Sequence, residues 1–159
     1  MDKLWAPWRM KYILAEKKEG CIFCEGVVRG DDRGGLILHR GSSCFVMMNR
    51  FPYNNGHIMV APYRHVGEFE DLNDAESLDL MKLLQLSVRT FKRVLNPQGF
   101  NVGINIGQVA GAGVIDHIHV HVVPRWDGDT NFMPVLSETK VINEELEETY
   151  DKLFKEFEP

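Results

Sequence analysis

The sequence predicts an α+β fold built on a largely antiparallel sheet of about five strands, with one long helix and one C-terminal helix. Short apolar runs bounded by Gly, Pro, Asn or Ser recur along the chain, one long stretch between them has helical periodicity, and a shorter amphipathic stretch follows. Successive strands that do not alternate with helices favour an antiparallel sheet with helix covering one face.

Five short apolar segments are the candidate strands. They are 36–38, 44–48, 57–60, 102–105 and 118–123. Segment 30–35, which is rich in Gly and Asp, is expected to be a loop between an N-terminal segment and the main fold.

The long helix is expected between the third and fourth strands. Its start has the capping pattern Asn73 with Glu76 three residues on, and Pro97 ends it because proline lacks the next backbone donor. Residues at alternating spacings of three and four indicate one apolar face. This face is predicted to consist of Met81, Leu84, Val88, Phe91 and Leu95.

The C-terminal helix is expected to begin near Asn143, a possible N-cap, and to pack on the domain or on a partner chain. Its apolar positions are Leu146, Tyr150, Leu153, Phe154 and Phe157.

Length and composition indicate one soluble globular domain. The chain has 159 residues, 44% hydrophobic and 26% charged, and no internal repeat or composition shift divides it. We expect an N-terminal segment 1–20, a core of about 21–126 and a helical tail of about 127–159.

The partners and the location follow from charge and from missing signals. With 18 Lys and Arg against 23 Asp and Glu, the chain lacks the basic field of a general nucleic-acid binder. No stretch approaches the roughly 20 apolar residues of a membrane span, and the N-terminus is unlike a signal peptide. Three cysteines are too few for a disulfide framework. We therefore expect a cytoplasmic protein with no nucleic-acid or membrane partner.

Three histidines alternate with apolar residues in the fifth candidate strand. Because strand side chains alternate, His117, His119 and His121 are expected on one face, with Ile118, Val120 and Val122 on the other. Neighbouring imidazoles hinder one another's protonation, and a neutral imidazole is both a nucleophile and a metal ligand. The alternatives are a metal site built from these rings and a polar stripe that faces solvent.

A glycine-rich stretch, 105–113, precedes the histidines. Glycines let backbone N–H groups turn toward an anion, although they also occur in ordinary tight turns. A phosphate held beside a histidine row suggests attack by an imidazole nitrogen on phosphorus, which leaves a phosphoramidate.

Cys21 and Cys24 have the spacing of a metal or redox pair. No second such pair completes a four-cysteine site, and neither a βαβ context nor a helix start at the cysteines is evident for a thioredoxin-like pair.

The segment 117–123 resembles the signature of the histidine triad (HIT) superfamily, His-x-His-x-His followed by two apolar residues. The segment 49–62 is similar to that family's nucleotide-binding hairpin, so the resemblance covers about 21–126. The bacterial branch related to dinucleoside tetraphosphate phosphorylases (ATP adenylyltransferases) looks most similar at 5–9, 110–113 and 124–126.

This resemblance implies a half-barrel sheet with helices, a homodimer, and a nucleotide α-phosphate held beside the triad. By the same resemblance His119 is the nucleophile, His121 binds phosphate oxygens, and Asn105 contacts the phosphate or the leaving-group bridge. Backbone groups near Gly113 would assist. Many relatives carry Gln or Ser where this chain has Gly113 and Val114, which leaves the proton donor for the leaving group open.

The resemblance also implies a nucleotide-binding set. Asn49 would bind the ribose hydroxyls, His57 would lie beneath the ribose and α-phosphate, and Met47 and Met59 would line the base slot. The alternatives are a turn residue for Asn49, core packing for the methionines and a buried structural role for His57.

Several HIT branches bind zinc through such a cysteine pair and two histidines. Here the ligands would be Cys21, Cys24, His65 and His117, and the zinc would be structural, with no organic cofactor. Free thiols and a surface His65 are the alternative.

Together these features predict a nucleotidyl transferase or hydrolase that acts on adenosine polyphosphates or related nucleotide conjugates through a covalent nucleotidyl-histidine at His119. A nucleotide or dinucleoside polyphosphate is the expected substrate. The rival functions are a metal-dependent hydrolase with the histidine row as ligands, and a non-catalytic nucleotide-binding module.

Overall fold

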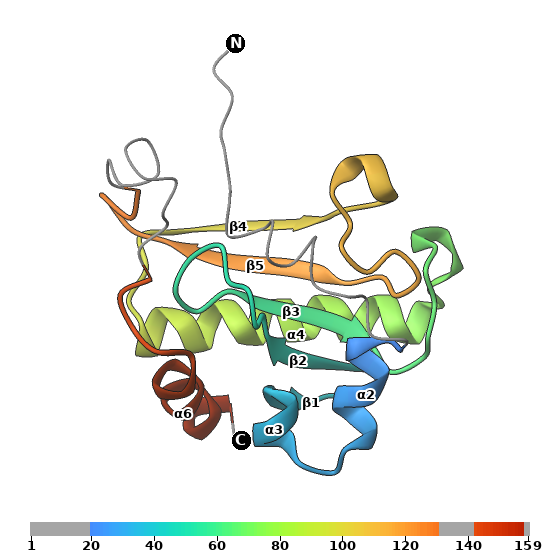
Figure 1. Ribbon diagram of the computed structural model, residues 1–159, viewed down its shortest axis with the longest axis horizontal. Helices are drawn as coiled ribbons and strands as arrows, with labels where there is room; N and C mark the ends of the chain where they lie inside the picture. Colours follow the sequence, from blue (N-terminus) through green and yellow to red (C-terminus); the bar gives the residue numbers. More distant parts are fainter. Residues whose placement is uncertain (1–19, 131–141, 158–159) are drawn as a thin grey trace.

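The computed structural model of the protein describes residues 20–130 and 142–157. Within these residues, a five-stranded antiparallel sheet has the order β1-β2-β3-β5-β4, and the long helix α4 crosses one of its faces (Figure 1). The predicted α+β class, with five strands, one long helix and one C-terminal helix, is confirmed. The strands are β1 Ile37–Arg40, β2 Cys44–Met48, β3 Ile58–Pro62, β4 Gly99–Ile104 and β5 Val120–Arg125.

In the part of the chain that the structure describes, two helices precede the sheet. Helix α2 spans Ile22–Val28 and was not predicted. The segment predicted as a loop, 30–35, contains the one-turn helix α3, Asp32–Gly35, so that prediction was wrong. The turn forms because the Asp31 side chain accepts the Gly34 N–H at 3.0 Å, the usual geometry of an N-cap.

Helix α4 spans Asp74–Val94, and its capping box is confirmed, with Asn73 and Glu76 each accepting the other's backbone N–H. Its predicted apolar face is correct in part: Phe91 is buried and Leu84 and Leu95 pack against the core, but Met81 is 54% exposed. The face toward the sheet includes Ser87, whose hydroxyl donates to the Leu83 carbonyl and needs no other partner. The helix residues buried there are Glu76, Leu80, Leu83, Ser87, Thr90 and Phe91.

The sheet has different surroundings on its two faces. The first face packs on α4 and on α6, Leu146–Phe157, which contacts both α4 and β1. Tyr150 of α6 donates its hydroxyl to the Ile37 carbonyl at 2.8 Å, which fixes α6 to the edge of the sheet. On the second face, Phe23 of α2 packs on a smaller apolar cluster. The members of that cluster are Phe23, Ile37, Phe45, Met47, Met59 and Ala61.

The fifth strand begins two residues later than predicted. His117 and His119 lie in the segment that leads into β5, because the Ile118 N–H donates to the Val66 carbonyl at 2.7 Å rather than to a strand. The expected alternation is seen at Val120 and Val122, which join the core beneath α4, while His121 pairs with Met59 of the opposite face.

Two short 3-10 helices, Phe69–Asp71 and Gln108–Ala110, complete the described elements. No helix in the described ranges is long and apolar enough to cross a membrane. Segment 5–9 lies outside the described residues, as does part of the tail expected at 127–159. The expected division of the chain stays a prediction.

Candidate active site and metal cluster

Residues from four neighbouring strands line up across the second face of the sheet, and His121 is one of them. The strand register places Met47 beside Met59, Met59 beside His121, and His121 beside Gly103. Since Gly103 has no side chain, and a Cβ built there would meet no atom within 4 Å, the face is open beside His121. The sheet therefore leaves room for a ligand next to His121.

His117 is fully buried and its two ring nitrogens have different partners. The Nε2 atom lies 2.9 Å from the Pro62 carbonyl, which can only accept, so Nε2 carries the proton. The unprotonated Nδ1 then faces Cys21 Sγ at 3.2 Å and Cys24 Sγ at 3.6 Å. Burial lowers the pKa of His117, and the bond to Pro62 opposes that shift. A neutral imidazole oriented by a carbonyl is the form that binds metals.

His117 belongs to a cluster that could hold a metal. One ligand atom each from Cys21, Cys24, His65 and His117 lies within 4.8 Å of the others, and His65 Nδ1 is 3.4 Å from Cys24 Sγ. In a tetrahedral zinc site, sulfur and nitrogen ligands are separated by about 3.3–3.8 Å. The donor set thus fits zinc, and the distances from Cys24 Sγ to His65 Nδ1 and to His117 Nδ1 lie in this range.

A cation would change the electrostatics of this cluster. Burial, and then the neighbouring Cys21, raise the pKa of the Cys24 thiol. A divalent cation would reverse this effect by stabilising both thiolates. Cys21 is the N-cap residue of α2 and Cys24 lies in its first turns, so this helix brings both thiols to His117.

His119 is held as a neutral ring with one nitrogen free of protons. Its Nδ1 lies 2.8 Å from the His117 carbonyl, so Nδ1–H donates and Nε2 keeps its lone pair. The ring is 5% exposed and lies 4.8 Å from the Phe23 ring, centre to centre. Burial lowers the pKa of His119, which the bond to His117 partly offsets. This is the tautomer that a nucleophilic Nε2 requires.

A chain of hydrogen bonds fixes the proton on His121. The Tyr53 backbone N–H donates to His57 Nδ1 at 3.0 Å, so the proton of His57 is on Nε2. His57 Nε2–H in turn donates to His121 Nδ1 at 2.9 Å, which places the His121 proton on Nε2. Burial, followed by the charges of His121 and His119, lowers the pKa of His57 to about 3. His121 is therefore a hydrogen-bond donor next to His119, with 4.8 Å between the ring centres.

The residues expected to bind the nucleoside occupy the same part of the molecule. Asn49 follows β2 and uses its Oδ1 in a local turn, accepting the Phe51 N–H at 2.8 Å, while its Nδ2 lies 3.5 Å from His57 Nε2. Met47 and Met59 are only 6% and 4% exposed, and both pack in the Phe23 cluster. The turn and core-packing alternatives are thus both present in the structure.

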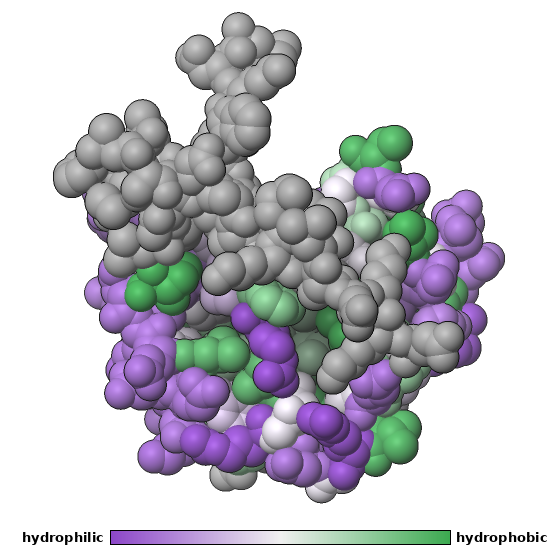
Figure 2. Space-filling view, viewed as in Figure 1, coloured by the Kyte–Doolittle hydropathy of each residue, from purple (hydrophilic) through white to green (hydrophobic). Residues whose placement is uncertain are grey.

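Asn105 and Gly113 lie in the loop between β4 and β5, which projects beyond the sheet (Figure 1). The half-buried Asn105 places its Nδ2 3.5 Å from the Gly111 carbonyl, and Gly113 is exposed. This loop also exposes apolar side chains, Val109 most of all, and green residues mark this corner of the surface in Figure 2.

Several groups of the site were not predicted from the sequence. Phe23 sits between the two cysteines and contacts both His117 and His119, a role that its place inside the Cys-x-x-Cys pair could have suggested. The Pro62 carbonyl and the Tyr53 N–H orient two histidines, but backbone groups give no signal in a sequence.

An open antiparallel sheet with three neighbouring histidines in and just before the strand next to its edge is the arrangement expected of the histidine triad class of proteins. The HIT domain family matches residues 35–128, and the chain belongs to this family. The resemblance predicted from the sequence is confirmed.

Similar proteins extend this match over most of the chain. The AP-4-A phosphorylase of Mycobacterium tuberculosis is 42% identical over 158 residues, which covers 94% of this chain and 80% of that protein. A histidine triad nucleotide-binding protein of Sulfolobus tokodaii is 27% identical and superposes with a TM-score of 0.68, covering 86% of this chain and 89% of its own. A zinc-bound histidine triad family protein of Mycobacterium smegmatis, 23% identical, has the same fold with a TM-score of 0.66 over 87% of this chain and 93% of its own.

Proposed function

We propose that this protein is a nucleotidyl-transferring enzyme that cleaves adenosine polyphosphates, diadenosine tetraphosphate among them, through an adenylyl group carried on His119. The observation that carries the proposal is the tautomer of His119, whose Nδ1–H is bound to the His117 carbonyl at 2.8 Å while Nε2 keeps its lone pair. The 42% identity to a protein named AP-4-A phosphorylase supports the choice of substrate.

Two displacements make up the proposed reaction. In the first, Nε2 of His119 attacks the α-phosphorus, a P–N bond forms, and the P–O bond breaks so that its electron pair leaves with ATP. In the second, an oxygen of inorganic phosphate or water attacks the same phosphorus, the P–N bond breaks, and the lone pair returns to Nε2. Phosphate as the acceptor gives ADP, and water gives AMP.

The neighbours of His119 act on the charges that develop. The His117 carbonyl accepts from Nδ1–H and stabilises the ring as it becomes positive. His121 Nε2–H donates to a non-bridging phosphate oxygen, where negative charge grows in the transition state. His57 keeps that proton in place.

The remaining site residues bind the nucleotide in this proposal. Asn49 contacts the ribose through Nδ2, since its Oδ1 already accepts the Phe51 N–H. Asn105 reaches the phosphate or the leaving-group bridge, and backbone groups near Gly113 assist. Met47 and Met59 form the wall of the base slot with their outer atoms while packing on the Phe23 cluster. Neither Gly113 nor Val114 has a side chain that donates a proton, so the leaving group takes its proton from elsewhere.

We further propose that Cys21, Cys24, His65 and His117 bind zinc as a structural ion. Four protein ligands fill a tetrahedral zinc site and leave no position for water or substrate, which keeps the ion out of the chemistry. Bound there, zinc would hold α2 and the loop after β3 against the residues that lead into β5. In the described part of the chain, this cluster includes His117 alone among the three triad histidines, which disfavours a hydrolase with the whole row as ligands.

A homodimer is the proposed assembly, with β4 at the interface. This strand is the edge of the sheet, its middle residues are exposed, and Val102 is 50% exposed. Val102→Arg should convert the dimer to a monomer in light scattering, whereas Val28→Arg on α2, at a residue 84% exposed, should not. A wild-type monomer would refute the proposal. The cytoplasmic location stays a prediction.

The decisive experiment combines product analysis with trapping. Wild-type protein is incubated with diadenosine tetraphosphate, with and without inorganic phosphate; ADP with ATP indicates phosphorolysis, and AMP with ATP indicates hydrolysis. Rapid denaturation and peptide mass spectrometry should find the adenylyl group on the peptide that contains His119. Phosphorus-chiral substrate should react with retention, because two inline displacements restore the configuration. Inversion would exclude the covalent intermediate, and turnover of no nucleotide conjugate would favour a binding module.

A further inference from the structure

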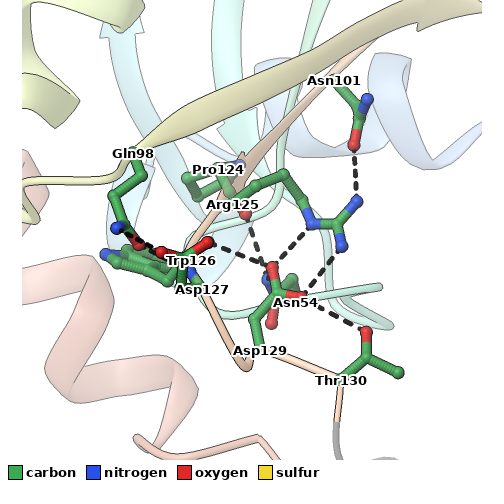
Figure 3. A network of polar contacts seen from close by, with 9 residues as sticks. All are labelled: Asn54, Gln98, Asn101, Pro124, Arg125, Trp126, Asp127, Asp129 and Thr130. Atoms are coloured by element: carbon green, nitrogen blue, oxygen red, sulfur yellow. Dashed lines mark hydrogen bonds and ion pairs between the residues drawn. The ribbon is translucent and has the colours of Figure 1, made fainter.

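A buried amide fixes the loop that carries the His57 contact. Asn54, in the loop between β2 and β3, is 8% exposed, and its Nδ2 donates to the Pro124 carbonyl at 3.1 Å and to Asp129 Oδ2 at 2.8 Å (Figure 3). Both hydrogens of the amide group therefore have acceptors, which leaves the side chain one favourable orientation.

Asp129 is the centre of this contact. Its side chain is 7% exposed and accepts from Arg125 Nε at 2.6 Å, from Arg125 Nη2 at 2.9 Å, and from the Trp126 N–H at 3.1 Å. The Arg125 bonds, above all, hold the pKa of this carboxyl far below its usual range. Arg125 also donates to Asn101 of β4 at 2.8 Å (Figure 3). We call Asn54, Arg125 and Asp129 the clasp, a charged anchor at the end of β5 in which the Asn54 and Asp129 side chains are nearly buried and Arg125 is exposed.

The clasp is adjacent to the hydrogen bond that sets the tautomer of His57. Tyr53, whose backbone N–H donates to His57 Nδ1, is the residue directly before Asn54 of the clasp. In the same turn, the His57 N–H donates to the Asn54 carbonyl at 3.2 Å. Two hydrogen bonds therefore tie His57 to this turn, one from the Tyr53 N–H to its Nδ1 and one from its own N–H to the Asn54 carbonyl. Movement of Asn54 would disturb the contact to Nδ1.

From this arrangement we propose that Asn54, Arg125 and Asp129 are positioning residues that hold His57, and through it His121, in the donor tautomer. The catalytic part of this inference rests on the proposed function; the tautomer part does not. Without the clasp, the Tyr53 N–H no longer points at Nδ1, so His57 can carry its proton on either nitrogen. His121 then presents a lone pair to the phosphate in part of the molecules, where a donor is needed.

The test compares variants that remove hydrogen bonds or charge of the clasp with a control variant that leaves the clasp side chains unchanged. Asn54→Ala removes the amide, Asn54→Ser is a milder change, and Asp129→Asn removes the charge. Gln98→Ala is the matched control, because Gln98 makes two hydrogen bonds with Asp127 in the same region but none with the clasp side chains (Figure 3).

Nitrogen-15 NMR of labelled histidines distinguishes the two tautomers, and turnover of diadenosine tetraphosphate is measured on the same samples. In wild type and in Gln98→Ala, His57 and His121 should both carry the proton on Nε2. In the Asn54 and Asp129 variants the signals should shift toward mixed tautomers, and kcat should fall about tenfold to a hundredfold while KM changes little.

Folded clasp variants with wild-type tautomers would overturn the proposal, even if their kcat were lower. Mixed tautomers with unchanged kcat would overturn its catalytic part. If the wild type turns over no nucleotide, the proposed function fails, but the NMR comparison still decides whether the clasp sets the tautomers. A variant that fails to fold is replaced in this comparison by Asn54→Ser.

Discussion

His117 and His121, the first and last of the three triad histidines, use their ring nitrogens in opposite ways. At one end, His117 binds the Pro62 carbonyl through Nε2–H and turns Nδ1 toward two thiols. At the other end, His121 accepts from His57 at Nδ1 and keeps its proton on Nε2. His119, between them, donates from Nδ1 to the His117 carbonyl and leaves Nε2 unprotonated.

In each of these rings, the partner of one nitrogen decides the chemistry of the other. A carbonyl can only accept and a backbone N–H can only donate, so each fixes a tautomer without any charged residue. Burial keeps the three rings with lowered pKa, His57, His117 and His119, neutral. One residue type thereby supplies a metal ligand, a nucleophile and a hydrogen-bond donor within a few ångströms.

The largest effect is expected at the middle of the row. His119→Ala should lower kcat for diadenosine tetraphosphate by about 10⁴-fold or more, because no other group supplies the attacking nitrogen. Nucleotide affinity should change little and zinc content should stay that of wild type, since the metal-facing atom belongs to His117. Calorimetric titration with a non-hydrolysable analogue and elemental analysis check both.

Retained turnover in His119→Ala would show that another residue is the nucleophile. A parallel loss of zinc would instead show that the two functions of the row cannot be separated. Phe23 lies against the ring, so His119→Gln, which fills more of the space, guards against a packing effect.

Much of the fold could be predicted because the signals were local. The capping box of Asn73 and Glu76 and the alternation at Val120, His121 and Val122 depend on near neighbours in sequence. The buried face of α4 was predicted only in part, because it also includes Ser87 and Thr90, small polar residues that do not count as apolar.

The site divides in the same way. The four candidate metal ligands were named from a resemblance, and the structure brings their ligand atoms together from segments far apart in the chain. The tautomers could not be predicted, because they depend on the Pro62 carbonyl, the His117 carbonyl and the Tyr53 N–H, and backbone groups are the same at every position. Asp129 has no motif around it; only the fold brings it to Asn54.

The second effect concerns the His117 end. Cys24→Ser should abolish stoichiometric zinc and lower the free energy of unfolding by about 4 kcal/mol when free zinc exceeds the dissociation constant of wild type about a thousandfold. Urea unfolding with and without a chelator measures this change. Cys44→Ala is the control, because Cys44 is buried away from the cluster and its loss should leave zinc content unchanged. Full zinc content in Cys24→Ser would contradict the assignment of the ligands.

The third effect concerns the His121 end. His121→Ala should lower kcat about a hundredfold to a thousandfold, the range for loss of one donor to a developing negative charge. Zinc content and the free energy of unfolding in excess zinc should change far less than in Cys24→Ser. His121→Ala would therefore show its main defect in turnover, and Cys24→Ser in zinc binding and stability. An unchanged kcat would mean that His121 Nε2–H does not donate to the transferred phosphate.

The smallest effect tests the hydrogen bonds that run from the Tyr53 N–H through His57 to His121. The pKa of His57 is lowered to about 3, against an ordinary value of about 6.5, so the unfolded chain binds this proton more readily than the folded one. Stability from His57 is therefore complete above pH 6.5 and is lost as the pH falls toward 3, by about 2 kcal/mol between pH 6.5 and 5. The main physical cause is burial of the His57 ring, followed by the charges of His121 and His119. A second proton would also have to enter at Nδ1, where the Tyr53 N–H already points. Urea unfolding at several pH values should show this loss in wild type, and a shallower one in His57→Gln; carboxylates titrate in both proteins and cancel in the difference. Equal slopes would mean that His57 binds a proton as readily in the folded protein as in the unfolded chain, against the lowered pKa.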